Sequence, residues 1–257
     1  MLIKDIPLAR RDIIADRLEK GSAVVASTLA IEFSVSEDAI RRDLRALSAE
    51  GLCRRVYGGA LPLSSATAPM AVRMTEGQER KAVLARTAAA DIRRGEMIFI
   101  DSGSTNLAIT EFLPEEYELT VVTNSLAIAS ALLPRDDIRV VVLGGEINHQ
   151  VGGSVDGIAL LSLTQMTFDR AFIGACALSV ETGVCAFDMA DAVFKRQLIA
   201  SSERRVVLVT NEKLSLDAPH RIATLQQLSQ IIVEPDLPDS ELEILSQSSL
   251  LVVRATR

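Results

Sequence analysis

The stretch FSVSEDAIRRDLRALSAEGLCRRVYGGA, residues 33–60, decides how the first part of this 257-residue chain folds. Ser36 is a typical helix N-cap, and the two acidic residues that follow it suit the positive end of a helix. Apolar residues then recur at spacings of four and three: Ile40, Leu44 and Leu47. This spacing predicts a helix that packs through one apolar face and ends at Gly51.

Two further helical patterns precede this helix. The first begins at Pro7, which fits the first turn of a helix, and ends at Gly21. The second covers residues 26–33, and a tight turn at residues 34–36 connects it to the third. A short helix, a tight turn and a longer helix are typical of a helix-turn-helix unit.

The segment after the third helix predicts a β-hairpin. Residues 52–57 have a strand-like composition, Gly58-Gly59 is a turn signal, and Ala60 begins a returning strand. Three helices followed by a hairpin predict a winged helix-turn-helix domain.

Arginines gather on the outer side of the third helix and in the hairpin: Arg41, Arg42, Arg45, Arg54 and Arg55. Residues 1–60 carry a net charge of +1, whereas the rest of the chain carries −8. Guanidinium groups donate readily to guanine edges and phosphates, although a lone arginine run is more often a solvated helix face. Because the cap, the short preceding helix and the hairpin all agree, we favour DNA binding. The arginine cluster also disfavours a domain that makes only protein contacts.

Composition excludes several classes of protein. Hydrophobic residues make up 48% of the chain, which excludes disorder, and no apolar run approaches the roughly 20 residues that a bilayer crossing needs. The first twelve residues, MLIKDIPLARRD, mix charges and lack the apolar block of a secretory signal, so the cytoplasm is the expected compartment. Three cysteines without a C-x-x-C pair and only two histidines argue against a metal site and a hydrolase triad.

A change of composition predicts the domain boundary. Residues 62–75 are rich in Ser, Ala, Thr and Pro, so we place a linker there, between a DNA-binding domain at 1–61 and a larger domain at 76–257. An alanine-rich helix is expected at 76–93. Apolar strands then alternate with helices, which predicts an α/β domain with a mainly parallel sheet. The expected strands cover residues 97–101, 119–123, 138–143, 171–174, 206–209 and 231–234.

The strongest chemical motif in the larger domain follows its first strand. Ser102-Gly103-Ser104-Thr105 offers backbone amides and hydroxyls that suit a phosphate or carboxylate, although an ordinary helix cap would use the same residues. The next two strands end in residues 123–125 (Thr-Asn-Ser) and 144–145 (Gly-Gly), so three loops are expected to converge on one site.

Two lysines could neutralise a phosphate near these loops. Lys195 lies on a predicted helix, and Lys213 follows the strand at 206–209. The chain contains neither a Walker loop nor a G-x-G-x-x-G motif, so no nucleotide cofactor is expected.

These motifs resemble the DeoR family of bacterial transcriptional regulators. In the first domain the resemblance lies in residues 33–60, and in the second it lies in DSGSTN, VVTNS, LGG, FIGA and the helix that carries Lys195-Arg196. Together the matches cover about residues 10–234. The resemblance implies an N-terminal winged helix-turn-helix followed by a larger α/β sensor domain similar to ribose phosphate isomerases and CoA transferases.

The arginine pattern and the resemblance together imply two sets of site residues. The DNA-binding set comprises Ser36, Arg41, Arg42, Arg45, Arg54, Arg55, Gly58 and Gly59. The effector-binding set comprises Asp101, Ser102, Gly103, Ser104, Thr105, Asn124, Lys195 and Lys213. Asp101 could either hold a sugar hydroxyl or cap the following helix. Asp43 is interpreted as a partner for an arginine or another helix, because DNA phosphates would repel it.

The chain departs from the family pattern at several positions. Ala39 stands where threonine is common, and Tyr57 stands where a histidine usually precedes the diglycine. Asp191 replaces a common glutamate, Ser229 replaces an aspartate, and residues 210–213 read Thr-Asn-Glu-Lys instead of Asp-x-x-Lys. The resemblance therefore fixes neither the base preference nor the identity of the effector.

The expected function is a sequence-specific repressor of a carbohydrate-utilisation operon. A phosphorylated sugar or related metabolite is expected to release it from double-stranded operator DNA. We expect a homo-oligomer, dimer or tetramer, because one recognition helix covers too few base pairs. No cofactor, metal, membrane contact or catalytic residue is expected. The alternative is a sugar-phosphate isomerase-like enzyme with a DNA-binding appendage, for which Asp101 is the one candidate base beside the loop.

Overall fold

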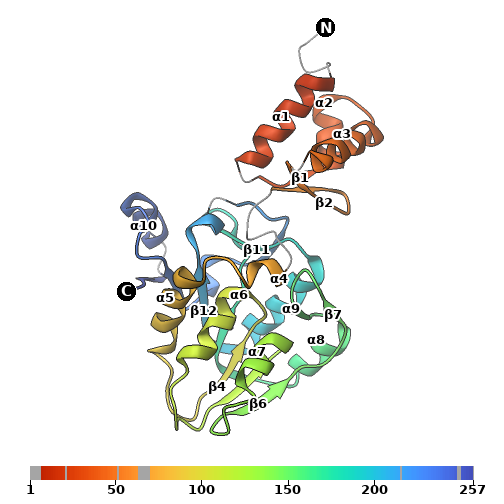
Figure 1. Cartoon of the computed structure of the whole chain (residues 1–257). Helices are drawn as coiled ribbons and strands as arrows, with labels where there is room; N and C mark the ends of the chain where they lie inside the picture. Colours follow the sequence, from red (N-terminus) through yellow and green to blue (C-terminus); the bar gives the residue numbers. More distant parts are fainter. Residues whose placement is uncertain are drawn as a thin grey trace.

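The computed structural model describes residues 7–20, 22–50, 52–62, 70–214, 216–247 and 250–256. A small helical domain stands on one end of a larger α/β domain (Figure 1). In the described segments no helix is long and apolar enough to cross a membrane. Gly21 and Gly51, which are predicted to end the first and third helices, lie outside these segments.

Three helices build the small domain as predicted: α1 (Pro7–Glu19), α2 (Ala26–Phe33) and α3 (Glu37–Ala49). The Ser36 hydroxyl accepts a hydrogen bond from the Ala39 amide at 3.3 Å, which confirms the predicted N-cap. The apolar face of α3 is buried in one core with Ile14 and Phe33. This packing leaves the opposite face of α3 exposed.

The wing contains one strand more than predicted. Strand β2 (Arg54–Val56) pairs antiparallel with β3 (Gly59–Leu61), and β1 (Val24–Val25) pairs with the other edge of β3. The turn falls on Tyr57-Gly58 rather than on the predicted Gly58-Gly59. Gly59 already belongs to β3, where a Cβ atom would clash with the carbonyl group of Val24. Gly59 is therefore required for strand packing.

A short helix, α4 (Met70–Arg73), lies within the segment predicted as a linker. The preceding residues 63–69 lie outside the described segments. Helix α5 (Gln78–Ala89) then occupies the centre of the alanine-rich stretch predicted as a helix. The boundary at residues 62–75 remains a prediction.

A seven-stranded parallel sheet forms the centre of the larger domain, in the order β15-β14-β12-β9-β4-β5-β6. Six of its strands overlap the predicted positions, although β9 and β12 begin earlier than predicted, and β15 is additional. The strands are β4 (Met97–Ile100), β5 (Thr120–Thr123), β6 (Arg139–Val142), β9 (Phe168–Ile173), β12 (Ser202–Val209), β14 (Gln230–Val233) and β15 (Leu251–Arg254).

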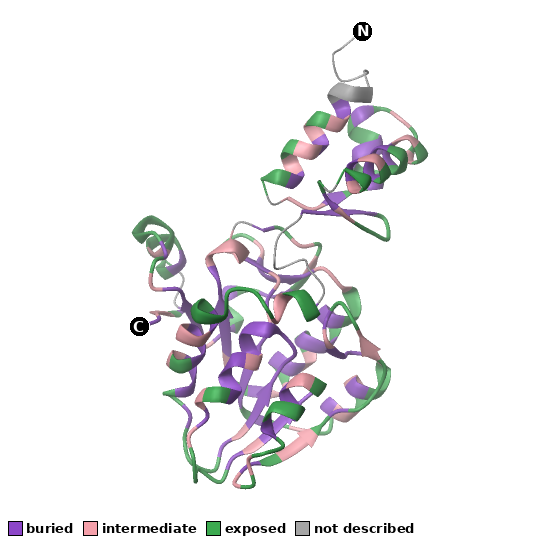
Figure 2. Cartoon of the chain, in the orientation of Figure 1, coloured by how far each residue is buried: buried purple, intermediate pink, exposed green. Residues whose placement is uncertain are grey.

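Helices cover both faces of this sheet (Figures 1 and 2). Residues of β4 alternate between two cores: Ile98 and Ile100 pack with α5, and Phe99 packs on the other face. One face carries α5, α6 (Ser104–Leu107), η3 (Ala108–Phe112) and α7 (Leu126–Leu132). The other carries α8 (Gly157–Leu163) and α9 (Met189–Ala200). Burial on both faces explains the continuous apolar strands of the sequence.

The larger domain also contains several short strands and helices outside the central sheet. Strands β10 (Ala177–Ser179), β11 (Gly183–Ala186) and β13 (His220–Ala223) form a small antiparallel sheet. A second small pair consists of β7 (Ile147–Asn148) and β8 (Gly153–Ser154). The described residues also form η4 (Asn211–Lys213), η5 (Leu225–Gln227) and α10 (Asp239–Ser246).

The strand order places a crevice beside β4. From β4 the chain passes to β5 and β6 on one side, and it later returns to β9 and β12 on the other side. The connections after β4 and β9 therefore leave the sheet in different directions. In open parallel sheets, ligands bind at such a switch point, beyond the carboxyl ends of the strands.

Candidate functional site

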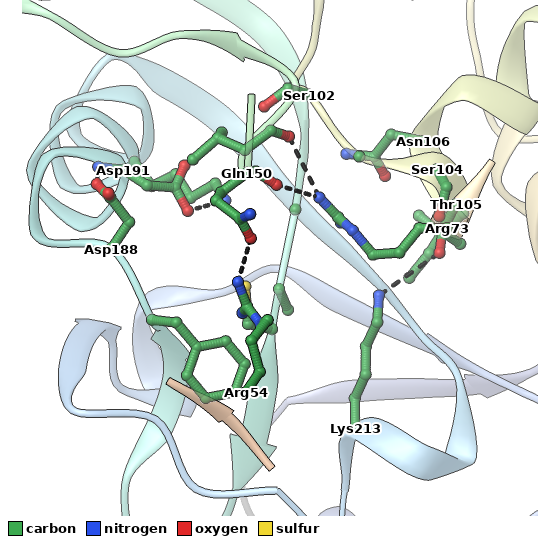
Figure 3. A pocket seen from close by; sticks show the side chains of 18 residues that line it. Arg54, Arg73, Ser102, Ser104, Thr105, Asn106, Gln150, Asp188, Asp191 and Lys213 are labelled. Atoms are coloured by element: carbon green, nitrogen blue, oxygen red, sulfur yellow. Dashed lines mark hydrogen bonds and ion pairs between the residues drawn. The ribbon is translucent and has the colours of Figure 1, made fainter. Parts of the chain in front are cut away.

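A pocket lies at this switch point, at the carboxyl ends of β4, β9 and β12 (Figure 3). The loops after β4 and β9, helix α9 and the β12–η4 segment form its walls. The β7–β8 turn, α4 and the wing contribute the rest. The lining residues are Arg54, Arg73, Ser102, Gly103, Ser104, Thr105, Asn106, Gln150, Val151, Gly174, Ala175, Cys176, Phe187, Asp188, Asp191, Lys195, Leu208 and Lys213.

The Ser/Gly/Thr loop after β4 lines the pocket as predicted. Gly103 is the N-cap of α6 and has φ +151°, a backbone conformation that favours glycine; no side chain of the described residues caps this helix. The loop is fixed from behind, because the Ser102 amide donates to Asn124 Oδ1 at 3.0 Å. The Asn106 side-chain amide donates to the carbonyl groups of Asp101 and Phe172 at 3.1 and 3.0 Å. The observed geometry therefore does not match the alternative of an ordinary Ser/Thr helix cap.

A buried group of three charges lies against this loop. The Lys195 ammonium pairs with Asp191 Oδ2 at 2.6 Å and with Asp101 Oδ2 at 3.5 Å, and all three side chains are almost completely buried. Burial alone would lower the pKa of Lys195, but the two carboxylates raise it. Burial raises the pKa of Asp101 to about 6, although Lys195 opposes that rise. Lys195 therefore lines the pocket with its charge already engaged by two carboxylates.

Lys213 brings a second ammonium group to the pocket. Its Nζ lies 3.5 Å from Thr105 Oγ1, which belongs to the Ser/Gly/Thr loop. Among the described residues it forms no ion pair with a carboxylate. Burial lowers the pKa of Lys213 to about 8, and the positive charge of Arg73 acts in the same direction. A bound anion would stabilise the protonated form of this lysine.

Two of the predicted effector residues do not line the pocket. Asp101 is completely buried, and its carboxylate accepts hydrogen bonds from the Gly174 amide at 2.8 Å and from Ser102 Oγ at 3.5 Å. It neither caps α6 nor faces the open space of the pocket. Asn124 lies behind the loop, where it holds Ser102. Both residues position the pocket wall.

The predicted convergence of the loops after β4, β5 and β6 is corrected by the strand order. β9, not β6, is the second neighbour of β4, so the loop at residues 174–176 lines the pocket. Gly144-Gly145 does not line it, and Gly145 instead packs against the Asp156 carboxylate. Among the residues after β5, Asn124 contributes indirectly: it accepts the hydrogen bond that holds the Ser102 amide.

Sequence reasoning missed several pocket residues. Asp191 appears there only as a departure from a family pattern, yet its Oδ1 atom is buried without a hydrogen-bond partner among the described residues. Arg73 comes from the predicted linker, and Gln150 comes from a turn without a motif. Arg54, predicted as a DNA contact, has a side chain that lines this pocket. Local sequence contained one signal for this part of the pocket. Asp188 is the N-cap of α9 and accepts a hydrogen bond from the Asp191 amide at 2.9 Å.

The other predicted DNA contacts lie on the small domain. Arg42, Arg45 and Arg55 are exposed, as are Ser36 and Gly58. Arg41 is exposed and forms ion pairs with Glu37 at 2.6 Å and Asp38 at 3.2 Å. A groove between α3 and the wing is lined by residues that include Arg41, Arg55 and the fully exposed Tyr57. Gly59 is buried and serves the wing strands.

The described segments contain no group of three or more His, Cys, Asp or Glu side chains that could hold a metal ion. The pocket itself combines cations and hydroxyls near Thr105 with a carboxylate at Asp191. Such a set can bind an anion at one side and accept a hydrogen bond at the other.

Comparison with known protein families gives two matches. Residues 10–66 match the DeoR-like helix-turn-helix domain, and residues 76–235 match the DeoR C terminal sensor domain. The chain is 29% identical to the glycerol-3-phosphate regulon repressor of Escherichia coli (strain K12) over 238 residues, which cover 92% of this chain and 94% of that protein. It is 28% identical to the putative aga operon transcriptional repressor of Escherichia coli O157:H7, over 95% of this chain and 92% of that one.

Two solved structures match the chain at low similarity. Ribose 5-phosphate isomerase A from Methanocaldococcus jannaschii matches with a TM-score of 0.39 and 18% identity over 54% of this chain and 55% of that chain. The sorbitol operon regulator SorC from Klebsiella pneumoniae matches with a TM-score of 0.41 and 10% identity over 92% of this chain and 98% of that chain.

Proposed function

The chain belongs to the DeoR family of transcriptional regulators, and from this premise we propose that it represses a carbohydrate-utilisation operon until a phosphorylated sugar or polyol fills its pocket. It is a DNA-binding regulator with a helix-turn-helix domain and a sensor domain. The rival interpretation, a sugar-phosphate isomerase with a DNA-binding appendage, depends on Asp101 as a general base. Asp101 is fully buried against Lys195 and does not line the pocket, which speaks against that role.

The observation that carries the proposal is the polarity of the pocket. Lys213 and Arg73 lie on the side of Thr105, where hydroxyl groups can also donate to a phosphate. On the side of α9, the unpartnered Oδ1 atom of Asp191 can accept a hydrogen bond from a sugar hydroxyl. A phosphorylated sugar satisfies both sides, whereas a neutral sugar leaves the cations without an anion.

Calorimetry with the full chain tests this assignment. We expect a phosphorylated sugar or polyol to bind where its dephosphorylated form does not. Substitution of both Thr105→Ala and Lys213→Ala should abolish binding, whereas Thr164→Ala with Lys20→Ala, which changes two exposed residues outside the pocket, should retain it. Equal binding of the neutral sugar, or undiminished binding by the pocket variant, would refute the phosphate site.

The operator can be identified directly. A random pool of duplexes selected with the full-length protein, followed by genomic footprinting, should yield a two-fold symmetric sequence upstream of carbohydrate genes. Adding the phosphorylated ligand should release the protein from this sequence, because the ligand stabilises an arrangement with weaker DNA affinity. Ligand-independent occupancy of the operator would contradict the repressor model.

Exposed apolar side chains support a homo-oligomer. Large hydrophobic residues on α7, directly after α7 and on α8 are more than half exposed: Leu126, Leu133, Ile158 and Leu161. Contiguous exposed apolar surface often marks a protein interface, so the surfaces of these two helices are the candidate contacts between subunits. We expect a dimer or tetramer in sedimentation velocity, and Leu133→Lys with Leu161→Lys should shift the protein toward the monomer. A monomeric parent protein at micromolar concentration would contradict this part of the proposal.

The domain limits and the cytoplasmic location expected from the sequence follow from this function. Residues 1–61 would bind DNA, residues 62–75 would connect the domains, and residues 76–257 would sense the effector. A regulator of operator DNA would act in the cytoplasm, where both the DNA and phosphorylated sugars are present. Limited proteolysis at the segment 62–75 and cell fractionation test these two points.

A further inference from the structure

Arg54 belongs to the DNA-binding domain, but its side chain lines the sensor pocket. It lies on wing strand β2, and its guanidinium donates a hydrogen bond to Gln150 Oε1 in the β7–β8 turn (Figure 3). The same glutamine is held from the sensor side, because Arg73 donates to its backbone carbonyl at 2.7 Å. Gln150 therefore joins the wing to the pocket.

The wing strand presents consecutive arginines to different sites. Side chains alternate along a strand, so Arg54 and Arg55 point to opposite sides of β2. Arg54 lines the sensor pocket, while Arg55 is exposed and lines the groove that also contains Arg41 and Tyr57. One three-residue strand thus connects the pocket with the DNA-binding surface.

Within the described part of the chain, the charge of Arg54 lacks a carboxylate partner. No ion pair to Arg54 is found among the described residues, and its Nε atom is buried without a hydrogen-bond partner. Burial lowers the pKa of Arg54, and the nearby positive charge of Arg73 adds to this effect. The neutral amide oxygen of Gln150 compensates this charge only weakly, so an anion in the pocket would be a better acceptor.

The turn that holds Arg54 is also tied to the floor of the pocket. Asn148 Oδ1 accepts from the Gln150 amide at 2.9 Å, and the Asn148 side chain donates to Asp188 Oδ2 at 3.2 Å. Asp188 caps α9, the helix that carries Asp191 and Lys195. A ligand between α9 and Arg54 would therefore contact two elements that hydrogen bonds through Asn148 and Gln150 already connect.

We propose that Arg54 binds the anionic group of the effector, and that this contact couples the sensor pocket to the position of the wing on DNA. The inference rests on the proposed function of the pocket and adds the residue that transmits its occupancy. The wing and α3 share one core through Cys53 and Ala60, so restraint of β2 also restrains the recognition helix. An effector that binds more tightly when Arg54 faces the pocket shifts the balance between pocket-bound and DNA-bound wings.

The test compares R54Q with R55Q in the full-length protein. The probes are inorganic phosphate and glycerol 3-phosphate in calorimetry, and a duplex selected from a random pool in DNA titrations. We expect R54Q to weaken phosphate binding about tenfold or more, because a charge-assisted hydrogen bond is lost. R54K should be intermediate, since it retains the charge without the fork. R55Q should weaken DNA binding and leave the phosphate affinity at the value of the parent.

The decisive quantity is the ratio of DNA affinities without and with saturating glycerol 3-phosphate. We expect a ratio of about 5 to 150 for the parent, the usual range of allosteric coupling, and a ratio near one for R54Q. Q150A removes the competing acceptor, so it should strengthen phosphate binding a few fold. Thermal unfolding of each variant confirms that the fold is intact.

Three outcomes separate this inference from the proposed function. If neither these probes nor any phosphorylated sugar or polyol binds the parent protein, the proposed function fails and the role of Arg54 falls with it. If the probes bind R54Q within twofold of the parent, only the role of Arg54 is overturned. If R54Q loses DNA affinity as R55Q does while its coupling ratio stays at the parental value, Arg54 is a DNA contact and the inference is wrong.

Discussion

The Arg10 guanidinium donates a hydrogen bond to the Asp43 carboxylate at 2.6 Å, and their side chains are only 6% and 9% exposed. This ion pair links α1 to α3 across 33 positions of sequence. It explains why an acidic residue stands in the recognition helix, as the sequence analysis predicted: Asp43 faces α1 rather than DNA. The pair fixes the helix that carries Arg41, Arg42 and Arg45.

We predict that Asp43→Ala destabilises the DNA-binding domain by about 3–5 kcal/mol, the usual cost of leaving one partner of a buried ion pair unpaired. Urea unfolding followed by circular dichroism measures this loss. The double variant Arg10→Met with Asp43→Leu should lose less stability than the sum of the losses in Arg10→Met and in Asp43→Leu, because no charge remains unpaired. Additive effects in this cycle would mean that the ion pair makes no net contribution.

We predict that Arg41→Ala and Arg42→Ala each weaken operator binding by about 1–3 kcal/mol, the range of a bidentate base contact. Arg41 is held by Glu37 and Asp38 in the free protein, so part of its contact energy is spent in breaking these ion pairs. Arg42→Ala should therefore cost at least as much as Arg41→Ala. Fluorescence anisotropy of a labelled operator measures both.

Arg139→Ala is the matched control for these variants, because Arg139 is an exposed arginine at the far edge of the sensor sheet, on β6. Its operator affinity should equal that of the parent. For the parent, the logarithm of the affinity should fall with the logarithm of salt concentration, by about 0.9 per neutralised phosphate. A flat salt dependence would show that the arginine cluster is a solvated surface.

The local features of the DNA-binding domain could be predicted because neighbouring residues determine them. The Ser36 cap and the apolar spacing of α3 act within one or two helical turns. The pocket depends instead on distant contacts. Nothing near Asp191 in sequence indicates that Lys195 also reaches Asp101, and nothing near Gly174 indicates that its strand lies beside β4. Strand order and domain docking decide these neighbours, so the sequence predicted the loop, Lys195 and Lys213 but not the contributions of Arg54, Arg73 and Gln150 to the pocket.

Gly174 offers a steric test of the pocket. A Cβ atom at this position would lie 2.7 Å from the Ser102 carbonyl oxygen and 3.0 Å from Asp101 Oδ2. Gly174→Ala should therefore displace the loop, destabilise the domain by about 1–3 kcal/mol and weaken ligand binding. Gly157→Ala is the control, because a Cβ atom there meets nothing within 4 Å and the residue lies in α8. Parental stability and ligand affinity in Gly174→Ala would show that the loop after β4 is mobile rather than fixed.

The lowered pKa of Lys213 predicts how ligand binding depends on pH. Below about pH 8 the ammonium is charged in the free protein, so an anion gains its full attraction. A bound anion raises this pKa, so above pH 8 the complex holds more protons than the free protein, and the affinity falls as pH rises. The loss should approach about tenfold at pH 9 relative to pH 7, because the free lysine is then mostly neutral.

Calorimetry between pH 7 and pH 9.5 measures this profile, in a range where a phosphate monoester is already a dianion because its second pKa is about 6. Lys213→Arg is the matched variant: a guanidinium stays charged throughout, so its affinity should not change with pH in this range. Lys195 remains protonated in both proteins and contributes no slope near pH 8, since the carboxylates beside it raise its pKa. If Lys213→Arg kept the decline of the parent, another group would be titrating and Lys213 would not bind the phosphate. A pH-independent parent would likewise place the anion away from Lys213 and Thr105.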